Sequence, residues 1–247
     1  MRKEFAIQLY SVRDHMEKDY VGTLEKIAGM GYTAVEFAGF GGLSAAEMKG
    51  HLDRLGLTAY ATHTGFDLLS DDEKLKEQIE YHQVIGAKYM LCPWYELKTM
   101  EDVHKVAEVL NHVGEVAGKA GILTGYHNHG HEFQKVDDGA YLLDKLMEET
   151  NPETVKMELD VFWAEHAGCA CIPFMKKYGS RCALVHLKQI DADKNSVDLP
   201  DGVIDMPAVV ETARSFGTDK FIVEQEAYPV DSLISAAVNA GYLKAIL

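Results

Sequence analysis

The chain has 247 residues, of which 47% are hydrophobic and 26% charged, so it carries enough apolar material for one sizeable core. Its formal net charge is −15, and such an acidic protein is a poor partner for duplex DNA, RNA or an anionic membrane. A phosphorylated substrate is not excluded, because a metal ion or one lysine can reverse the field locally.

The sequence gives no signal for secretion or membrane insertion. The stretch from Met1 to Tyr10 runs directly into a predicted strand and lacks the apolar core and cleavage site of a signal peptide. No apolar run approaches the ~18 residues that a membrane span needs. The cysteines are Cys92, Cys169, Cys171 and Cys182. The lone C-x-C pair among them is a weak zinc signal, so we expect free thiols in a cytoplasmic protein.

Short apolar runs alternate with longer amphipathic stretches along the chain, which is the pattern of β/α units. The predicted strands are Phe5–Tyr10, Ala34–Phe37, Thr58–Thr62, Tyr89–Cys92, Leu123–His127, Val155–Asp160, Ala183–Lys188 and Phe221–Glu226. The stretches between them predict helices, among them Val21–Met30, Ala45–Leu55, Asp72–Ile85, Val103–Lys119 and Ala140–Glu149, and a last helix at Val230–Tyr242.

Glycines mark the transitions between these units. Gly31, Gly56, Gly86 and Gly121 each follow a predicted helix and precede a strand, as expected where a helix ends on a left-handed glycine. Eight strands and about eight helices in ~250 residues fit an α/β fold with a single (β/α)8 TIM barrel in one domain, residues 1–247. An open doubly wound sheet would need a glycine-rich loop after the first strand, where this chain has Tyr10-Ser-Val-Arg13.

Side chains that can bind a metal ion stand at the ends of four consecutive predicted strands. They occur in Tyr126-His127-Asn128-His129, Glu158-Leu159-Asp160, Val185-His186-Leu187-Lys188 and Val223-Glu224-Gln225-Glu226. In a closed parallel barrel these strand ends meet at one mouth. One ligand per strand gives His127, Asp160, His186 and Glu224, a mixed set that suits Mn²⁺, Zn²⁺, Co²⁺ or Fe²⁺ better than Ca²⁺. With open positions left on the ion, the set indicates a catalytic metal and hence an enzyme.

At these positions the sequence resembles the sugar phosphate isomerase/epimerase superfamily, the xylose isomerase-like TIM barrels that also include inosose dehydratases and apurinic endonucleases. Other stretches that carry the resemblance are Gln8-Leu-Tyr-Ser-Val-Arg13, Gly31-Tyr-Thr-Ala-Val-Glu36, Glu132-Phe133 and Gly202-Val-Ile-Asp205. The resemblance implies one divalent metal, with Mg²⁺ added to the candidates, bound by Asp160, His186 and Glu224. It also implies proton transfer next to the carbonyl of a small keto sugar or polyol, phosphorylated or not.

Two positions depart from the commonest pattern of the family. His127 stands where many sugar epimerases carry a glutamate that both binds the metal and moves a proton. Imidazole would leave the ion more electrophilic and remove one carboxylate base, which Glu132, Glu226 or His129 would have to replace. Trp163 stands where several epimerases carry a histidine that contacts substrate. Both departures weaken the prediction of a simple ketose 3-epimerase.

The remaining site candidates follow from their places at strand ends. The predicted catalytic residues are Glu224, Glu132 and Lys188, and the predicted substrate-binding residues are His63, Glu36, Trp94, His129 and Glu226. Lys188 would stabilise a developing oxyanion, with an ion pair to Asp191 or Glu226 as the alternative. Trp94 would stack on a sugar ring or cap the barrel rim.

Some charged side chains have plainer interpretations. Glu158 lies one layer deeper than Asp160, where an unpaired carboxylate is costly, so we expect a structural acid with partners. The histidines on predicted helices are expected at the surface, and they are His51, His82, His104 and His112.

We therefore expect a metal-dependent sugar isomerase or epimerase that removes a proton next to a carbonyl and passes through a metal-stabilised enediolate. The same site would serve a dehydratase or lyase acting on a keto sugar or inosose. An apurinic endonuclease needs more ions and a basic groove, which the net charge disfavours, and a non-catalytic sugar-binding barrel is disfavoured by the intact ligand set. The expected partner is a small sugar or polyol, not nucleic acid or membrane. The resemblance also implies a homo-oligomer.

Overall fold

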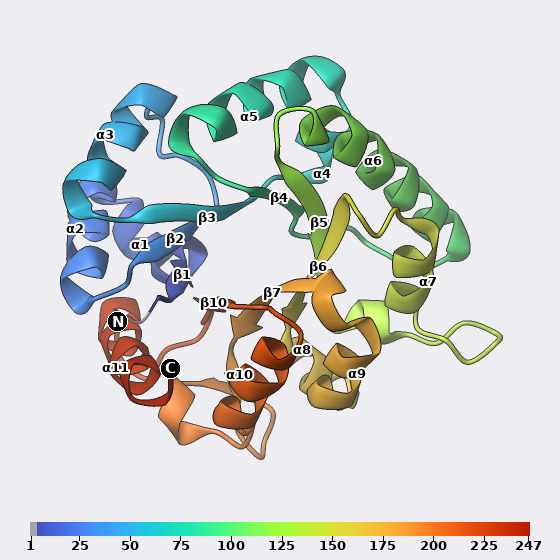
Figure 1. The fold of residues 1–247 in the computed structure, drawn as a ribbon. Coiled ribbons are helices and arrows are strands. Elements are labelled where there is room, and N and C mark those ends of the chain that lie inside the picture. Colours follow the sequence, from blue (N-terminus) through green and yellow to red (C-terminus); the bar gives the residue numbers. More distant parts are fainter. Residues whose placement is uncertain (1–3) are drawn as a thin grey trace.

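Eight parallel strands close into a barrel with helices around it (Figure 1). The structure is a computed structural model that describes residues 4–247. The strands are β1 (Ala6–Gln8), β2 (Ala34–Phe37), β3 (Thr58–His63), β4 (Tyr89–Cys92), β5 (Leu123–His127), β6 (Val155–Asp160), β7 (Cys182–Leu187) and β10 (Lys220–Val223). Strand β1 pairs with both β2 and β10, which closes the barrel. The predicted (β/α)8 fold is confirmed, and the open-sheet alternative is wrong.

The helices form an outer ring around the strands (Figure 1). They are α1 (Arg13–Met16), α2 (Tyr20–Met30), α3 (Ala45–Leu55), α4 (Phe66–Leu69), α5 (Asp72–Ile85), α6 (Met100–Gly118), α7 (Leu142–Glu149), α8 (Val161–His166), α9 (Cys171–Tyr178), α10 (Met206–Ser215) and α11 (Ser232–Ile246). A short hairpin of β8 (Gln189–Ile190) and β9 (Ser196–Val197) follows β7. Within residues 4–247, none of these helices has the length and apolar character needed to cross a bilayer.

The barrel interior is apolar toward the amino ends of the strands and polar toward their carboxyl ends. A cluster of mostly small and aliphatic side chains fills the lower level and includes Ala6, Ala34, Ala61, Leu184 and Ile222. Because side chains alternate between the two faces of a strand, the residue two positions later points the same way. Those residues are Gln8, Glu36, His63, His186 and Glu224. The alternation that packs the core therefore also directs the polar side chains toward the mouth.

Three strands end earlier than predicted: β7 ends one residue early, at Leu187, and β1 and β10 end at Gln8 and Val223. Strand β1 ends at Gln8 because the side-chain oxygen of Gln8 accepts a hydrogen bond from the backbone N–H of Tyr10 at 3.0 Å, and the chain turns into a 3₁₀ helix. Strand β10 ends at Val223, and the N–H of Gln225 donates to Ser11 Oγ at 3.0 Å instead of to a neighbouring strand. The acidic side chains after β10 therefore come from a loop. The bounds predicted for β2, β4, β5 and β6 are confirmed.

His82 was expected at the surface, and this prediction is wrong. The residue is fully buried on α5, where its Nδ1 lies 2.7 Å from the Gln78 carbonyl oxygen and its Nε2 lies 2.7 Å from Thr62 Oγ1. A carbonyl can only accept, so Nδ1 carries the proton and Nε2 accepts from the hydroxyl. Burial lowers the pKa of His82 to about 4. A polar residue on the inner face of a helix adds nothing to an apolar periodicity, which is why the sequence pattern missed it.

We predict that His82 makes the protein less stable in mild acid. Its pKa is about 4 in the folded protein and near 6.5 in the unfolded chain, so protonation favours unfolding as the pH falls below about 6.5. Between pH 7 and pH 5 this group should remove about 2 kcal/mol from the free energy of unfolding. Urea titrations at both pH values should show that His82→Asn loses this part of the pH dependence. His51→Asn on α3 is the control, and equal pH dependence in all three proteins would contradict the prediction.

Candidate active site

The carboxyl ends of four neighbouring strands bring the predicted metal ligands together. One donor atom from each of His127, Asp160, His186 and Glu224 lies within 4.8 Å of the others, and all four residues are buried. A second set that shares the two histidines meets the same distance limit, namely His63, His127, Glu158 and His186. The directions in which the rings point distinguish the two sets.

Each shared imidazole lies between two levels of carboxylates. His127 Nδ1 is 3.0 Å from Glu158 Oε2, and its Nε2 is 3.9 Å from Glu224 Oε2. His186 Nε2 is 2.6 Å from Glu36 Oε2 and 3.2 Å from Glu158 Oε2. Its Nδ1 is 3.3 Å from Glu224 Oε2. Each ring therefore turns one nitrogen toward the deeper acids and the other toward Glu224.

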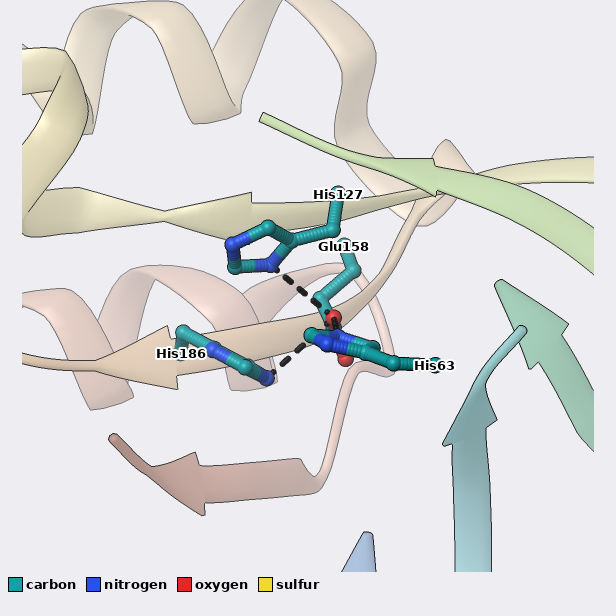
Figure 2. A group of neighbouring side chains, drawn as sticks. All are labelled: His63, His127, Glu158 and His186. Carbon is teal, nitrogen blue, oxygen red and sulfur yellow. Dashed lines mark hydrogen bonds and ion pairs between the residues drawn. The ribbon is translucent and has the colours of Figure 1, made fainter. Parts of the chain in front are cut away.

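Glu158 contacts three imidazoles through one carboxylate oxygen (Figure 2). Its Oε2 lies 2.8 Å from His63 Nε2, 3.0 Å from His127 Nδ1 and 3.2 Å from His186 Nε2. A carboxylate accepts hydrogen bonds, so His63 Nε2 and His127 Nδ1 donate to Glu158. His186 Nε2 donates to Glu36 and lies at ion-pair distance from Glu158. In a neutral ring the other nitrogen keeps its lone pair. For His127 that lone pair faces Glu224, and the Nδ1 of His186 faces the same carboxylate. The partners that we expected for Glu158 are therefore present, and two of them are predicted ligands.

Asp160 is hydrogen-bonded at one carboxylate oxygen and not at the other. Its Oδ1 accepts a hydrogen bond from the backbone N–H of Trp163 at 3.1 Å, which caps α8. Its Oδ2 is buried and has no hydrogen-bond partner. A buried carboxylate oxygen without a partner is costly, so this atom is suited to a ligand that the protein atoms do not supply.

Lys188 is a buried cation that faces three carboxylates. Its Nζ pairs with Glu226 and lies 3.6 Å from Glu224 Oε2 and 3.9 Å from Asp160 Oδ2. The ammonium group also lies 4.9 Å from the centre of the Trp163 ring. The ion pair with Glu226 that the sequence offered as an alternative is present. It does not remove Lys188 from the cluster.

Burial sets the charges of the acids, and neighbouring cations modify them. Burial raises the pKa of Asp160 to about 7, against the opposing effect of Lys188. Burial and the charge of Glu158 raise the pKa of Glu36 to about 7. Burial acts on Glu224 in the same direction, but Lys188 and His186 outweigh it and hold the pKa of Glu224 well below its usual range. Glu224 is therefore the ionised carboxylate at the mouth.

The imidazoles divide into neutral and charged groups. Burial lowers the pKa of His127 to about 4 and that of His129 to about 2. Burial acts the same way on His186, but Glu158 and Glu36 outweigh it and raise its pKa well above the ordinary value. Near pH 7, His127 is neutral, which is the form in which imidazole binds a metal.

A cavity of about 360 Å³ opens over this cluster. The predicted residues that line it are His63, Trp94, His127, His129, Glu224 and Glu226. Trp94 is 52% exposed, so its ring is accessible at the rim. Tyr10 and Ala38 also line the cavity and were not predicted. Both lie just past the end of a strand, which was the available signal.

Five predicted site residues lie outside this lining. Asp160, His186 and Lys188 are buried members of the cluster described above, and the other two are Glu36 and Glu132. The Glu36 side chain is fully buried and accepts a hydrogen bond from Gln8 Nε2 at 2.9 Å, in register with the last residue of β1 and below the loops that form the mouth. Glu132 accepts hydrogen bonds from the Tyr126 hydroxyl at 3.0 Å and the His129 N–H at 2.9 Å. Tyr126 alternates with His127, so Glu132 lies on the outer side of β5. These positions favour supporting roles over direct contact with substrate.

The residues at the mouth fit a divalent metal. Two imidazole nitrogens, the unpaired Asp160 oxygen and the ionised Glu224 carboxylate face one another. The second nitrogen of each ring is bonded to a carboxylate, which is the usual outer support of a metal-binding histidine. In the set with His63 and Glu158, one carboxylate oxygen already contacts all three imidazoles, and Glu158 is not among the residues that line the cavity, although its Oε1 has no hydrogen-bond partner either. The mouth-facing set is therefore the better candidate metal centre.

The protein is a TIM barrel. At the carboxyl ends of its strands it carries a cluster of imidazole and carboxylate groups that could bind a metal ion. The sequence profile of the xylose isomerase-like TIM barrel family matches residues 24–245. The chain belongs to this family.

Proteins named as dehydratases and as isomerase/epimerases are similar to this chain in sequence. The chain is 26% identical over 204 residues to the inosose dehydratase of Geobacillus kaustophilus, covering 73% of this chain and 64% of that protein. It is 30% identical over 133 residues to inosose dehydratase 2 of Bacillus cereus, covering 53% and 43%. It thus spans less than two thirds of the length of these curated relatives. A solved sugar phosphate isomerase/epimerase from Parabacteroides distasonis is 26% identical, with a TM-score of 0.84 over 99% of this chain and 94% of that one.

We predict that Glu158 controls the protonation of His186. In Glu158→Gln the neutral amide removes the charge that most strongly raises this pKa, so the pKa of His186 should fall toward its ordinary value of about 6.5. Nitrogen-15 NMR of the metal-free protein measures the imidazole pKa and tautomer directly. Glu153→Gln, at an exposed position just before β6, is the matched control. An unchanged His186 titration in Glu158→Gln would contradict the assignment.

Proposed function

We propose that His127, Asp160, His186 and Glu224 bind one divalent metal and that the protein is an enzyme that removes a proton next to the carbonyl of a keto sugar or keto-polyol. The observation that carries the proposal is the convergence of four donors, among them an Asp160 oxygen that accepts no hydrogen bond from the protein. A divalent ion bound there would act as a Lewis acid on the substrate carbonyl.

The carboxylates that line the cavity come from one segment of the chain. They are Glu224 and Glu226, both from the loop after β10, and Lys188 lies behind them. Among the imidazoles of the lining, His63 Nε2 is bonded to Glu158, and the low pKa of His129 makes it a weak base. Inverting one carbon requires proton transfer on two opposite faces, whereas isomerisation or elimination of water can use one face. This arrangement favours isomerase or dehydratase chemistry over the epimerase chemistry we also expected.

The roles of the residues follow from their contacts. Glu224, ionised at the mouth, takes the proton next to the carbonyl. Lys188 places its positive charge beside the oxygen on which negative charge develops. Glu224 then returns the proton that it took, either to the neighbouring carbon or to a departing hydroxyl that leaves as water. Glu226, which lines the cavity, holds the Lys188 ammonium group in place through their ion pair. Glu132 positions His129 through its backbone N–H.

Dehydration of a keto-polyol is the outcome that we favour. The one-sided arrangement permits it, and the relatives from Geobacillus kaustophilus and Bacillus cereus are named inosose dehydratases. Aldose–ketose isomerisation is the second candidate, because it uses the same face and the Parabacteroides distasonis protein is named an isomerase/epimerase.

Asp160→Ala should lose both metal and proton transfer. We expect Mn²⁺ affinity to fall by more than the ~10–100-fold typical of losing an outer supporting residue, because a ligand is removed. Solvent deuterium exchange into scyllo-inosose and a panel of ketoses should fall by at least ~100-fold. Calorimetry and mass spectrometry measure the two quantities, and ultraviolet absorbance of the unsaturated ketone separates dehydration from isomerisation.

Asp193→Ala, at an exposed position in the β8–β9 hairpin, is the control and should behave as wild type. Retained metal binding and retained exchange in Asp160→Ala would refute the proposed centre.

A further inference from the structure

A second cavity adjoins the candidate active site. Its volume is about 470 Å³, and it shares two wall residues, Tyr10 and Ala38, with the cavity over the metal ligands. Each cavity lies in the range of roughly 300–1,000 Å³ that is typical of pockets for small molecules. The role proposed above uses only the first cavity. The second one extends away from the cluster toward Glu17 and Tyr20.

Tyr10, between the two cavities, is held as a rigid aromatic wall. Its backbone N–H donates to the side-chain oxygen of Gln8 at 3.0 Å, and its carbonyl accepts a hydrogen bond from Arg13 Nη1 at 3.0 Å. The Arg13 guanidinium lies over its ring, 4.4 Å from the ring centre. Even so, Tyr10 remains 43% exposed. A fixed and exposed aromatic ring can pack against the apolar face of a sugar at little entropic cost.

The far side of the second cavity is also preformed. The Tyr20 hydroxyl donates to the Gly39 carbonyl oxygen at 2.8 Å. Gly41 has φ +61°, and a Cβ there would lie 2.4 Å from the Tyr20 ring, so only glycine lets the loop approach this closely. The loop after β2 is thus fixed against α2. A ligand entering this cavity would not have to order it.

The charges around the two cavities favour an uncharged ligand. The Arg13 guanidinium already donates to three oxygens, the Tyr10 carbonyl, the Tyr228 hydroxyl and the Glu226 carbonyl. Lys188 is paired with Glu226. Glu17 adds a carboxylate to the wall of the second cavity. A phosphate would therefore meet acids and already occupied cations, whereas the hydroxyls of a sugar could bond to either kind of group.

We propose that the cavity beside Tyr20 is a subsite for a second ring, so that the substrate is an uncharged keto-glycoside whose keto-sugar ring reaches the metal ligands while the linked ring packs beyond Tyr10. This inference rests on the proposed function and names its substrate class. It also selects an unphosphorylated substrate, which the sequence left open.

Binding measurements on the metal-loaded protein test the subsite. The probes are maltose, cellobiose, lactose, trehalose and sucrose, with glucose, galactose, fructose and glucose 6-phosphate for comparison. At least one disaccharide should bind about 10-fold more tightly than its component sugars, as an added ring on a rigid aromatic would give. Saturation-transfer NMR should show contacts on both of its rings. Glucose 6-phosphate should bind no more tightly than glucose.

A matched pair of variants locates the effect. Glu17→Trp fills the second cavity and should abolish the disaccharide gain while leaving monosaccharide affinity unchanged. Lys18→Trp, at the next exposed position and outside the cavity lining, should leave both affinities unchanged. Equal affinity for disaccharides and monosaccharides, tighter binding of glucose 6-phosphate, or a disaccharide gain that survives Glu17→Trp would each overturn the inference.

Failure of the subsite is distinguishable from failure of the proposed function. Deuterium exchange into a ketose without any preference for two rings would overturn the subsite alone. A two-ring preference without exchange into any keto sugar would overturn the enzymatic role and retain the subsite.

Discussion

Acids buried together where the strands of a closed barrel converge must be compensated, and this requirement shapes the mouth. An isolated buried charge costs several kcal/mol, so each carboxylate needs a proton, a cation or a donor beside it. Glu158 forms ion-pair contacts with three imidazoles, and Lys188 lies among Asp160, Glu224 and Glu226. These contacts fix the direction of both candidate metal-binding rings. Asp160 Oδ2 accepts no hydrogen bond and lies among the donor atoms of the other three predicted ligands, so it remains available to a bound ion.

Much of this arrangement could be predicted from the sequence, because it follows from the alternation of side chains within strands and from the order of the strands in the barrel. Alternation within strands placed His127, Asp160 and His186 on one inward face, and the parallel barrel brought their ends together. Glu224 was also found, although the chain leaves the strand at Val223. In that case the local order of residues was a better guide than the expected strand length.

What the sequence could not show were contacts made by groups that carry no periodic signal. The hydrogen bonds of Glu132 to Tyr126 and His129 depend on a loop whose path is not encoded in a pattern. The depth of Glu36 depends on its register with Gln8, and the burial of His82 depends on one threonine of a neighbouring strand. Each is a pairwise tertiary contact, and a single sequence constrains such contacts only weakly.

Arg13 joins the first strand of the barrel to the last. Its guanidinium bonds to the Tyr10 carbonyl and, 213 positions along the chain, to the Glu226 carbonyl. During synthesis on the ribosome, the hydrogen bond of Arg13 to the Glu226 carbonyl can therefore form only after almost the whole polypeptide has been made. A shortened translation product that stops before β10 would lack Glu224 as well as that anchor. The candidate active site is therefore complete only after β10 and the loop that follows it have been synthesised and the barrel has closed.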